Sequence, residues 1–258
     1  MRPHRLTPVF YWLMKYIVVG PIAKAIWRPW IIGAENIPPS GAAILASNHL
    51  SVADSIFLPL MIERQVAFLA KAEYFTGRGI KGWATKWFMK GTGQIPIDRS
   101  GGSASEAALN TALQVLGRDE LLGIYPEGTR SPDGVLYRGR TGIARMAMEA
   151  KVPVVPVVMV DTDTMMPIGR NIPRVVRVGI VIGKPLDFSR YAGMENDRYV
   201  LRSVTDEIMI ALQQLGQQRY EDVYASSKRN TPSGAEVVEP PFVDASASLP
   251  RTDAAPAS

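Results

Sequence analysis

The chain has 258 residues, 47% of them hydrophobic, which is enough to bury the core of one large α/β domain and excludes a collagen-like or wholly disordered protein. It contains no cysteine, which excludes disulfide bonds, thiolate metal sites and a cysteine nucleophile and is consistent with a cytosolic protein. The first 34 residues contain five basic residues and no acidic one, and removing those five from the total of 29 leaves 24 basic residues against 24 acidic ones.

The basic N-terminal segment also contains aromatic side chains, which are Phe10, Tyr11, Trp12, Trp27 and Trp30. Cations mixed with aromatic and long aliphatic residues are typical of a segment that binds an anionic membrane surface. A solvated basic arm and a nucleic-acid-binding arm are the alternatives, but long aliphatic residues stand here in place of Gly and Ser. We therefore expect residues 1–32 to bind a membrane, and we expect no nucleic-acid partner.

By length alone, residues 8–32 could cross a bilayer, because a membrane-spanning helix needs about 20 apolar residues. However, three basic residues interrupt the segment, and the Gly-Pro pair at positions 20–21 is expected to break a helix in its middle. We therefore predict two short helices that lie in the membrane interface. A secretory signal cleaved at residues 23–25 is the alternative, but its apolar stretch is of marginal length, so we expect the segment to be retained.

Strand and helix patterns alternate after Gly33 and predict an α/β fold with a mixed, largely parallel sheet flanked by helices, over residues 33–225. Apolar runs predict strands at residues 42–46, 66–70, 94–97, 121–125, 152–160 and 175–182. Helices are predicted at residues 55–62, 80–90, 105–116, 141–150 and 197–215. Pro96 favours an edge strand or a bulge. Residues 226–258 are rich in Pro, Ala and Ser and are predicted to be a disordered tail.

His49 is one of two histidines, and the other, His4, lies near the start of the chain, so His49 is the main candidate for a histidine base. On one continuous helix, His49 and Asp54 would point roughly 140° apart. They meet only if His49 lies in the loop before a helix and Asp54 in its first turn, with Ser51 as the N-cap. The carboxylate would then fix the imidazole tautomer. The structural alternative is a capping box, in which Asp54 only satisfies helix N–H groups.

A turn-rich stretch follows the strand predicted at residues 121–125 and contains Glu127, Gly128, Thr129 and Arg130. Backbone N–H groups in such a turn can bind an anion or an oxyanion. Alternatively, Glu127 and Arg130 form a surface pair beside an ordinary type I turn. On these residues alone, the turn is the favoured interpretation.

Arg99 ends the stretch at residues 93–99, and a bidentate arginine suits a phosphate monoester. A surface pair with the preceding aspartate is the commoner use of such a residue. Lys71, Arg138 and Arg140 lie near predicted strand ends or a helix start, where they can share one phosphate.

Three further patterns are weak. The Gly-rich residues 77–82 match a dinucleotide-binding pattern, but residues 71–76 separate them from the preceding strand. Asp161 and Asp163 can hold a metal, although such a pair after a strand is usually an ordinary loop. The absence of a Gly-x-Ser-x-Gly sequence argues against a serine hydrolase.

The segments that contain the candidate catalytic and binding residues resemble the ordered blocks of the glycerophospholipid acyltransferases, specifically the 1-acylglycerol-3-phosphate acyltransferase family. The blocks are His49 with Asp54, residues 93–99, residues 126–131 and residues 152–157, spread over about residues 33–184. Each block alone is weak, but the ordered set at normal spacing is specific. Two departures are Pro96, where the family often has an aromatic residue, and arginines in place of lysines before Gly142.

The resemblance implies that His49 is the base and Asp54 its partner, that Arg99 binds phosphate, and that Glu127 and Gly128 position the acceptor. We add Lys71, Thr129, Arg130 and Arg140 to the expected substrate-binding set. The resemblance also implies an N-terminal two-helix membrane module, in agreement with the expectation for residues 1–32.

The expected reaction is direct transfer of a fatty acyl group from acyl-CoA or acyl carrier protein to the sn-2 hydroxyl of 1-acylglycerol 3-phosphate, giving phosphatidic acid. We expect no metal or cofactor, and we expect the protein at the cytoplasmic face of the cell membrane. The residues Trp83, Trp87, Phe88 and Met89 either line an acyl groove, rest on the membrane or pack on the sheet.

Three alternative functions remain open from the sequence. The first is a related acyltransferase that acts on another lysophospholipid, glycerol 3-phosphate or a glycolipid. The second is a non-catalytic peripheral protein that binds phospholipid, and the third is an oxidoreductase that binds a nucleotide at residues 77–82.

Overall fold

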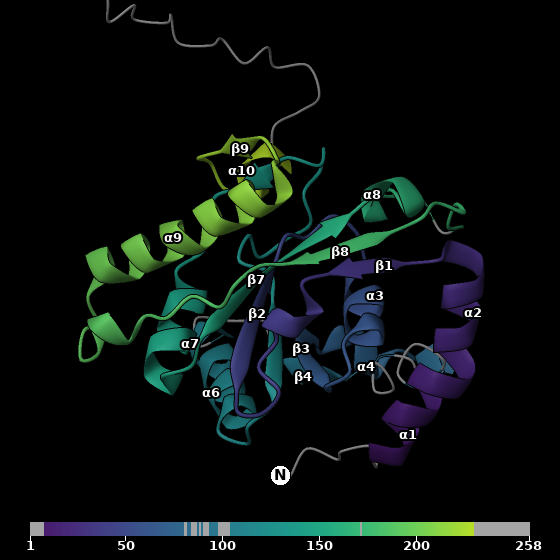
Figure 1. Cartoon of the computed structure of the whole chain (residues 1–258), viewed down its shortest axis with the longest axis horizontal. Helices are drawn as coiled ribbons and strands as arrows, with labels where there is room; N and C mark the ends of the chain where they lie inside the picture. The colour runs from purple at the N-terminus through teal and green to yellow at the C-terminus, as the bar shows by residue number, and fades with distance from the viewer. Residues whose placement is uncertain are drawn as a thin grey trace, which may run out of the picture.

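The computed structural model describes residues 8–79, 82–83, 87, 89, 93–97, 104–170 and 172–229 (Figure 1). Most of the helix predicted at residues 80–90 and most of the tail predicted at residues 226–258 lie outside this range. The short helix α10 (Ala225–Arg229) occupies the start of the predicted tail.

Within the described residues, the central sheet has seven strands in the order β1-β8-β7-β2-β5-β3-β4. The strands are β1 (Trp30–Ile32), β2 (Ala43–Ser47), β3 (Val66–Lys71), β4 (Gln94–Ile97), β5 (Leu121–Ile124), β7 (Val154–Val160) and β8 (Gly179–Ile182). Every neighbouring pair is parallel except β7 and β8, which are antiparallel. The predicted mixed, largely parallel sheet is therefore confirmed, and β4, which contains Pro96, lies at its edge.

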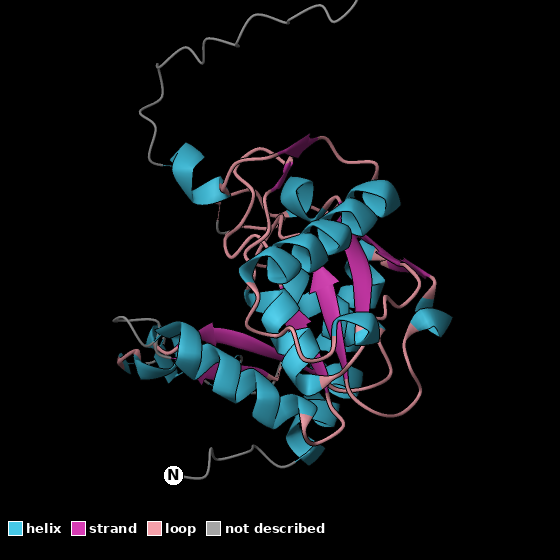
Figure 2. Cartoon of the chain, turned by 90° about the vertical axis from the view of Figure 1, so that its left-hand side faces the viewer, coloured by secondary structure: helices cyan, strands magenta, loops and turns pink. Residues whose placement is uncertain are grey.

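Helices cover both faces of the sheet. One face carries α6 (Ala104–Leu116), α7 (Gly142–Ala150) and α9 (Arg198–Gly216), and the other carries α2 (Val19–Trp27) and α3 (Asp54–Met61). Figure 1 shows the two groups on opposite sides of the strands, and Figure 2 looks onto the side of α6, α7 and α9. The shorter helical elements are α1 (Pro8–Leu13), α4 (Glu73–Thr76), α8 (Thr162–Met165), and the 3₁₀ turns η2 (Ala34–Asn36) and η3 (Ser189–Tyr191).

Strand β2 lies at the centre of the molecule, with all of its residues buried. Its side chains alternate between the two core clusters, because successive residues of a strand point to opposite faces. Ile44 and Ala46 pack under α6, α7 and α9, whereas Ala43 and Leu45 pack under α2 and α3. The loop that follows β2 therefore starts from a fully buried strand at the centre of the sheet.

The N-terminal helical segment differs from its prediction, because Gly20 and Pro21 do not break it. Helices α1 and α2 are joined by a π-helical turn, η1 (Met14–Val18), in which the Val19 N–H donates to the Met14 carbonyl. A wider π turn accommodates a proline ring that would clash with the carbonyl four residues earlier in a regular α-helix. A side chain at Gly20 would place Cβ only 1.9 Å from the Lys15 oxygen, so only glycine fits there. None of the described helices is both long and apolar enough to cross a bilayer.

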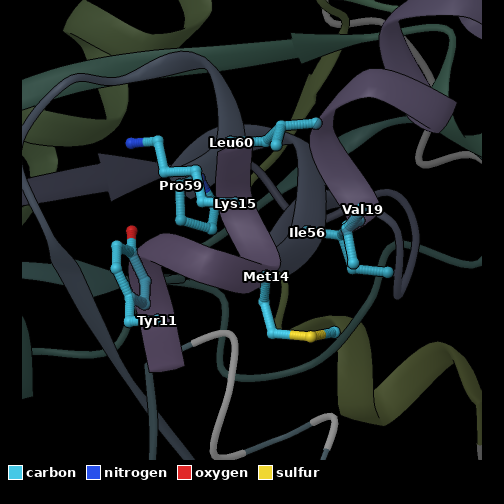
Figure 3. Close-up of a pocket in the computed structure, with 7 residues that line it drawn as sticks. All are labelled: Tyr11, Met14, Lys15, Val19, Ile56, Pro59 and Leu60. Carbon is cyan, nitrogen blue, oxygen red and sulfur yellow. The ribbon is translucent and has the colours of Figure 1, made fainter. Parts of the chain in front are cut away.

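Lys15 anchors this N-terminal segment to α3. Its ammonium donates to the carbonyls of Ile62 and Glu63, which directly follow α3, where the helix dipole favours a cation. Burial, with a contribution from nearby Lys24, lowers the pKa of Lys15 to about 8. Figure 3 shows Lys15 among the residues of both segments that line a shallow, mostly apolar hollow, which are Tyr11, Met14, Lys15, Val19, Ile56, Pro59 and Leu60.

Three further differences from the sequence-based elements concern strands. Residues 30–32, expected to belong to the membrane-binding helical segment, form the edge strand β1, which pairs with β8. The strand predicted at residues 175–182 begins only at Gly179, and residues 172–178 form an exposed loop that ends at buried Val178. A separate two-stranded ribbon, β6 (Leu136–Tyr137) with β9 (Tyr220–Glu221), was not predicted. Its strands have two residues each, which is too short to show a strand periodicity, and no sequence pattern connects two segments so far apart.

We expect Gly123→Ala to destabilise the protein by about 1–3 kcal/mol, because overpacking a buried strand displaces its neighbours. A Cβ at Gly123 would lie 2.3 Å from the ring of Phe68 on the adjacent strand. The free energy of unfolding in urea measures the effect. Gly142→Ala is the matched control, since no atom lies within 4 Å of the added Cβ at the start of α7. Equal stability of the two variants would contradict this account of the sheet.

Candidate active site

The candidate site lies at the carboxyl edge of the parallel part of the sheet. Strands β7, β2, β5, β3 and β4 run in the same direction, so their carboxyl ends meet at one edge. His49 follows β2, Tyr125 and Glu127 follow β5, and Lys71 is the last residue of β3. Ligands of open α/β sheets bind at this edge.

His49 and Asp54 contact each other as predicted. The His49 Nδ1 atom lies 2.9 Å from Oδ2 of Asp54, which is the first residue of α3 and is fully buried. The same oxygen accepts the N–H groups of Leu50 and Ser51, each at 2.8 Å. Asp54 therefore binds two backbone N–H groups of the loop before α3 and orients the imidazole at the same time.

Ser51 is not the N-cap of α3, contrary to the prediction. The N-cap is Ala53, and it makes no side-chain capping bond. The Ser51 hydroxyl instead accepts the Ala53 N–H at 3.3 Å and donates to the Met166 carbonyl at 2.9 Å. The hydroxyl thus links the His49 loop to the segment after α8.

The other edge of the imidazole faces solvent. The His49 side chain is 16% exposed, and no described residue forms a hydrogen bond with its Nε2 atom. The Tyr125 ring stacks on the imidazole at 3.8 Å with an angle of 12° between the planes, and Phe68 stacks on Tyr125. The Tyr125 hydroxyl lies 2.7 Å from the Ser55 hydroxyl. The ring of His49 is therefore held at one nitrogen and one face, while its Nε2 remains available.

Glu127 lies behind the site and binds the backbone. One carboxylate oxygen accepts the His49 N–H at 3.4 Å, and the other accepts the Tyr137 N–H at 3.0 Å. The residue is 1% exposed, and burial raises its pKa to about 8. The charges of Asp54 and Asp133 add to this rise, whereas the two backbone donors oppose it. Its carboxylate ties together the loops that follow β2 and β5.

Gly128, Thr129 and Arg130 continue the turn after β5. The Gly128 N–H donates to the Tyr125 carbonyl at 3.0 Å, and its φ of +75° favours glycine. The Arg140 side chain packs against Gly128, since an added Cβ would lie 3.0 Å from Cδ and Nε of the arginine. At the end of the turn, the Ser131 N–H donates to the His49 carbonyl at 2.7 Å. The structure thus brings the two predicted constellations into direct contact.

Arg138 and Arg140 are held by the C-terminal segment that follows α9. Both guanidinium groups lie over the Tyr224 ring, at 5.6 Å and 5.1 Å from its centroid. Arg138 also lies 3.6 Å from Asp222, and Arg140 donates to the Ser226 hydroxyl at 3.2 Å. Tyr224 and Ser226 were not predicted from the sequence, because no local pattern connects them to the site.

A second missed network fixes the loop after β2. The Asn48 side chain bonds to both backbone groups of Met159 in β7, with its Oδ1 accepting at 2.7 Å and its Nδ2 donating at 3.1 Å. Nδ2 also donates to Gln218, which donates in turn to the Gly134 carbonyl at 3.0 Å. The one signal for this network in the sequence was that Asn48 is a polar residue directly before His49, after the strand predicted at residues 42–46.

Several predicted residues remain without a described side chain. Arg99 lies outside the described residues, as does Phe88, and for Lys71 only the backbone position at the end of β3 is described. Trp83 and Trp87 are exposed, and their rings lie 5.5 Å apart. The weak Gly-rich pattern at residues 77–82 follows α4 rather than a strand, as expected. Among the described residues, no three His, Asp or Glu side chains form a cluster that could hold a metal.

Comparisons with known proteins find a matching family and several relatives. A family model described as Acyltransferase matches residues 28–160. A chloroplast 1-acyl-sn-glycerol-3-phosphate acyltransferase of Arabidopsis thaliana is 32% identical over 62% of this chain and 44% of its own length. An enzyme of the same name from Bacillus subtilis is 27% identical over 63% of this chain and 75% of its own length. The chain therefore spans less than half of the plant relative and about three quarters of the bacterial one.

A solved structure is also similar. The crystal structure of the 1-acyl-sn-glycerophosphate acyltransferase PlsC from Thermotoga maritima matches with a TM-score of 0.58 and 25% sequence identity. The match covers 81% of this chain and 87% of that protein.

We expect the stability of the wild-type protein to fall, relative to that of Glu127→Gln, as the pH rises from about 4.5 to about 8. In this range the unfolded chain has released the Glu127 proton and the folded protein still holds it, so stability is lost with rising pH. The slope is at most about 1.4 kcal/mol per pH unit. Urea unfolding at several pH values measures it, with Glu106→Gln on the exposed side of α6 as the control. Parallel pH profiles for wild type and Glu127→Gln would contradict the assignment.

Proposed function

The chain belongs to the acyltransferase family, whose model covers just over half of it, and on this premise we propose that it is a 1-acylglycerol-3-phosphate acyltransferase. The proposed reaction moves a fatty acyl group from a thioester donor, acyl-CoA or acyl carrier protein, to the sn-2 hydroxyl of 1-acylglycerol 3-phosphate. The product is phosphatidic acid. The observation that carries the proposal is the 2.9 Å contact between His49 Nδ1 and Asp54, which leaves Nε2 open at the edge of the sheet.

In the proposed mechanism, His49 Nε2 takes the proton of the sn-2 hydroxyl as that oxygen attacks the thioester carbon. The resulting tetrahedral oxyanion collapses, the carbon–sulfur bond breaks, and the imidazolium returns the proton to the leaving thiolate. Asp54 keeps the proton on Nδ1 beforehand and stabilises the imidazolium while it exists. General base catalysis of this kind typically contributes about 10²–10⁴-fold. The reaction needs no metal or cofactor besides the thioester donor.

The acceptor phosphate requires cations near His49. We assign this role to Arg99 by resemblance and to Arg140, because its side chain packs on the turn that contacts the His49 loop. Lys71 and Arg130 are further candidates, and Gly128 supplies the surface on which the Arg140 side chain packs. Glu127 contributes indirectly, because its carboxylate is engaged by two backbone donors and fixes the loop that contains His49.

The lipid substrates imply that the protein works on a membrane. The N-terminal helical segment exposes large apolar side chains, which are Leu13, Tyr16, Ile17, Val18, Ile22 and Ile26. Such a surface, together with the basic residues of this segment, supports association with an anionic bilayer. We propose that the protein is peripheral or monotopic at the cytoplasmic face of the cell membrane.

The proposed function is tested by the release of free thiol from acyl-CoA. Purified protein is expected to release CoA thiol only when 1-acylglycerol 3-phosphate is also present, and His49→Ala is expected to abolish the release. Release with glycerol 3-phosphate or another lysophospholipid in place of 1-acylglycerol 3-phosphate would change the assigned acceptor. If the wild type releases no more thiol than His49→Ala, with either acyl-CoA or acyl carrier protein as donor, the catalytic proposal fails.

We expect Asp54→Asn to keep the fold and to lower kcat by about 10²–10⁴-fold, because the amide no longer favours the productive tautomer or stabilises the imidazolium. Steady-state kinetics measures kcat, and the thermal unfolding midpoint checks the fold. Asp206→Asn on α9, where the carboxylate pairs with Arg202, is the control and should retain wild-type turnover. A wild-type kcat in Asp54→Asn would rule out the orienting role.

A further inference from the structure

The loop between α8 and β8 exposes an unusual set of aliphatic side chains. Ile172 is 81% exposed, Val175 is 73% exposed and Ile168 is 47% exposed. We call the described residues of this segment, 166–170 and 172–177, the lipid loop. Monomeric proteins rarely leave several large aliphatic residues of one short segment in water unless a partner covers them.

Three exposed arginines alternate with these aliphatic residues in the lipid loop, and they are Arg170, Arg174 and Arg177. No acidic residue occurs between Asp163 and Asp187 in the sequence. None of the three arginines forms an ion pair with a described residue. The loop therefore combines uncompensated positive charge with apolar side chains, which is the chemistry of a segment that binds anionic lipid.

Backbone hydrogen bonds fix the base of the lipid loop. The Arg174 N–H donates to the Met165 carbonyl at 2.7 Å, and the Arg170 N–H donates to the Pro167 carbonyl at 3.1 Å. These two bonds fix the backbone of the loop at Arg170 and at Arg174. The exposed aliphatic side chains therefore belong to a loop that backbone hydrogen bonds close.

The lipid loop lies against the C-terminal end of α2, as Figure 1 shows at the right of the molecule. The Trp27 indole N–H donates to the Arg174 carbonyl at 2.8 Å, and Arg177 Nε donates to the Arg28 carbonyl at 3.1 Å. Helix α2 adds exposed Ile22 and Ile26 to the same region. Two segments far apart in the sequence, both basic and apolar, are therefore in direct contact.

We propose that the lipid loop is a second membrane-contacting element, which places Ile168, Ile172 and Val175 among lipid headgroups and its three arginines on lipid phosphates. The partner is an anionic bilayer rather than a protein, because the sequence between Asp163 and Asp187 lacks acidic residues and the loop packs against an N-terminal segment that is also basic and apolar. The proposal extends beyond residues 28–160, the part matched by the family model.

The lipid loop also connects directly to the candidate active site. The Met166 carbonyl accepts the hydroxyl of Ser51, whose own N–H donates to Asp54. Val52, next in the chain, is 42% exposed. Contact of the loop with lipid would therefore bring the His49 loop close to the bilayer surface. This consequence rests on the proposed function, since it matters only if the acceptor is a membrane lipid.

Vesicle sedimentation tests the proposal without any assay of activity. The probes are vesicles of phosphatidylcholine alone and vesicles of equal parts phosphatidylcholine and phosphatidylglycerol. Each arginine near an anionic surface strengthens binding about fivefold. The variant with Arg170→Gln, Arg174→Gln and Arg177→Gln is therefore expected to bind the anionic vesicles at least about tenfold more weakly. The variant with Ile168→Ser, Ile172→Ser and Val175→Ser is expected to bind both kinds of vesicle more weakly.

The matched control removes three exposed arginines from the opposite side of the molecule, with Arg118→Gln, Arg145→Gln and Arg198→Gln. It carries the same net charge as the loop arginine variant and is expected to bind anionic vesicles within about threefold of wild type. Equal weakening in both arginine variants, or wild-type binding in both loop variants, would overturn the proposal. So would a wild-type dimer in sedimentation velocity that the serine variant dissociates, because a second copy would then cover the loop.

Acyl transfer to a short-chain acceptor in detergent separates this proposal from the proposed function. If both loop variants keep wild-type turnover in detergent and lose vesicle binding, the loop contacts lipid and the site is intact. If the wild type is inactive in detergent and binds vesicles through the loop, the acyltransferase proposal fails while the lipid loop stands.

Discussion

A single carboxylate oxygen organises the candidate site. Oδ2 of Asp54 accepts three donors, the His49 imidazole and the N–H groups of Leu50 and Ser51, at 2.8–2.9 Å. Hydrogen bonds to a charged group are stronger than those between neutral groups, and breaking them here would leave a buried charge unpaired. The oxygen therefore joins the start of α3 to the loop after β2 and fixes which imidazole nitrogen faces solvent. Oδ1 is also buried and has no hydrogen-bond partner among the described residues, so the carboxylate depends on this one set of donors.

The rest of the site supports this contact from neighbouring strands. Glu127 and Ser131, which follow β5, bind the His49 backbone at its N–H and its carbonyl. Tyr125 covers one face of the imidazole, and Phe68 from β3 supports Tyr125. Parallel strands make this possible, because they bring segments distant in the sequence to one edge of the sheet. The imidazole is thus held in one orientation without a substrate, and in the proposed mechanism this reduces the entropic cost of reaching the reactive geometry.

Much of the fold and part of the site were predictable from the sequence. The strands at 66–70, 94–97 and 121–125 and the helix at 197–215 followed from local periodicity. Helix geometry gave only the condition for the His49–Asp54 contact, and the resemblance to the family favoured it over a capping role alone. Features that depend on tertiary contacts were not predictable. The π turn before Pro21, the ribbon of β6 and β9, and the links from Asn48 to Gln218 and from Arg140 to Ser226 join residues with no shared local pattern. For the same reason, the sequence could not show that the Glu127 carboxylate faces the backbone.

The central claim is that Asp54 holds the neutral His49 ring in the tautomer with the proton on Nδ1, so that Nε2 can act as a base. Nitrogen-15 NMR of histidine-labelled protein tests this claim directly, because the chain contains only two histidines and His4→Gln leaves His49 alone. At a pH where the ring is neutral, we expect a protonated Nδ1 signal and an unprotonated Nε2 signal, with this preference lost in Asp54→Asn. A proton on Nε2, or the same tautomer ratio with and without the Asp54 carboxylate, would contradict the account.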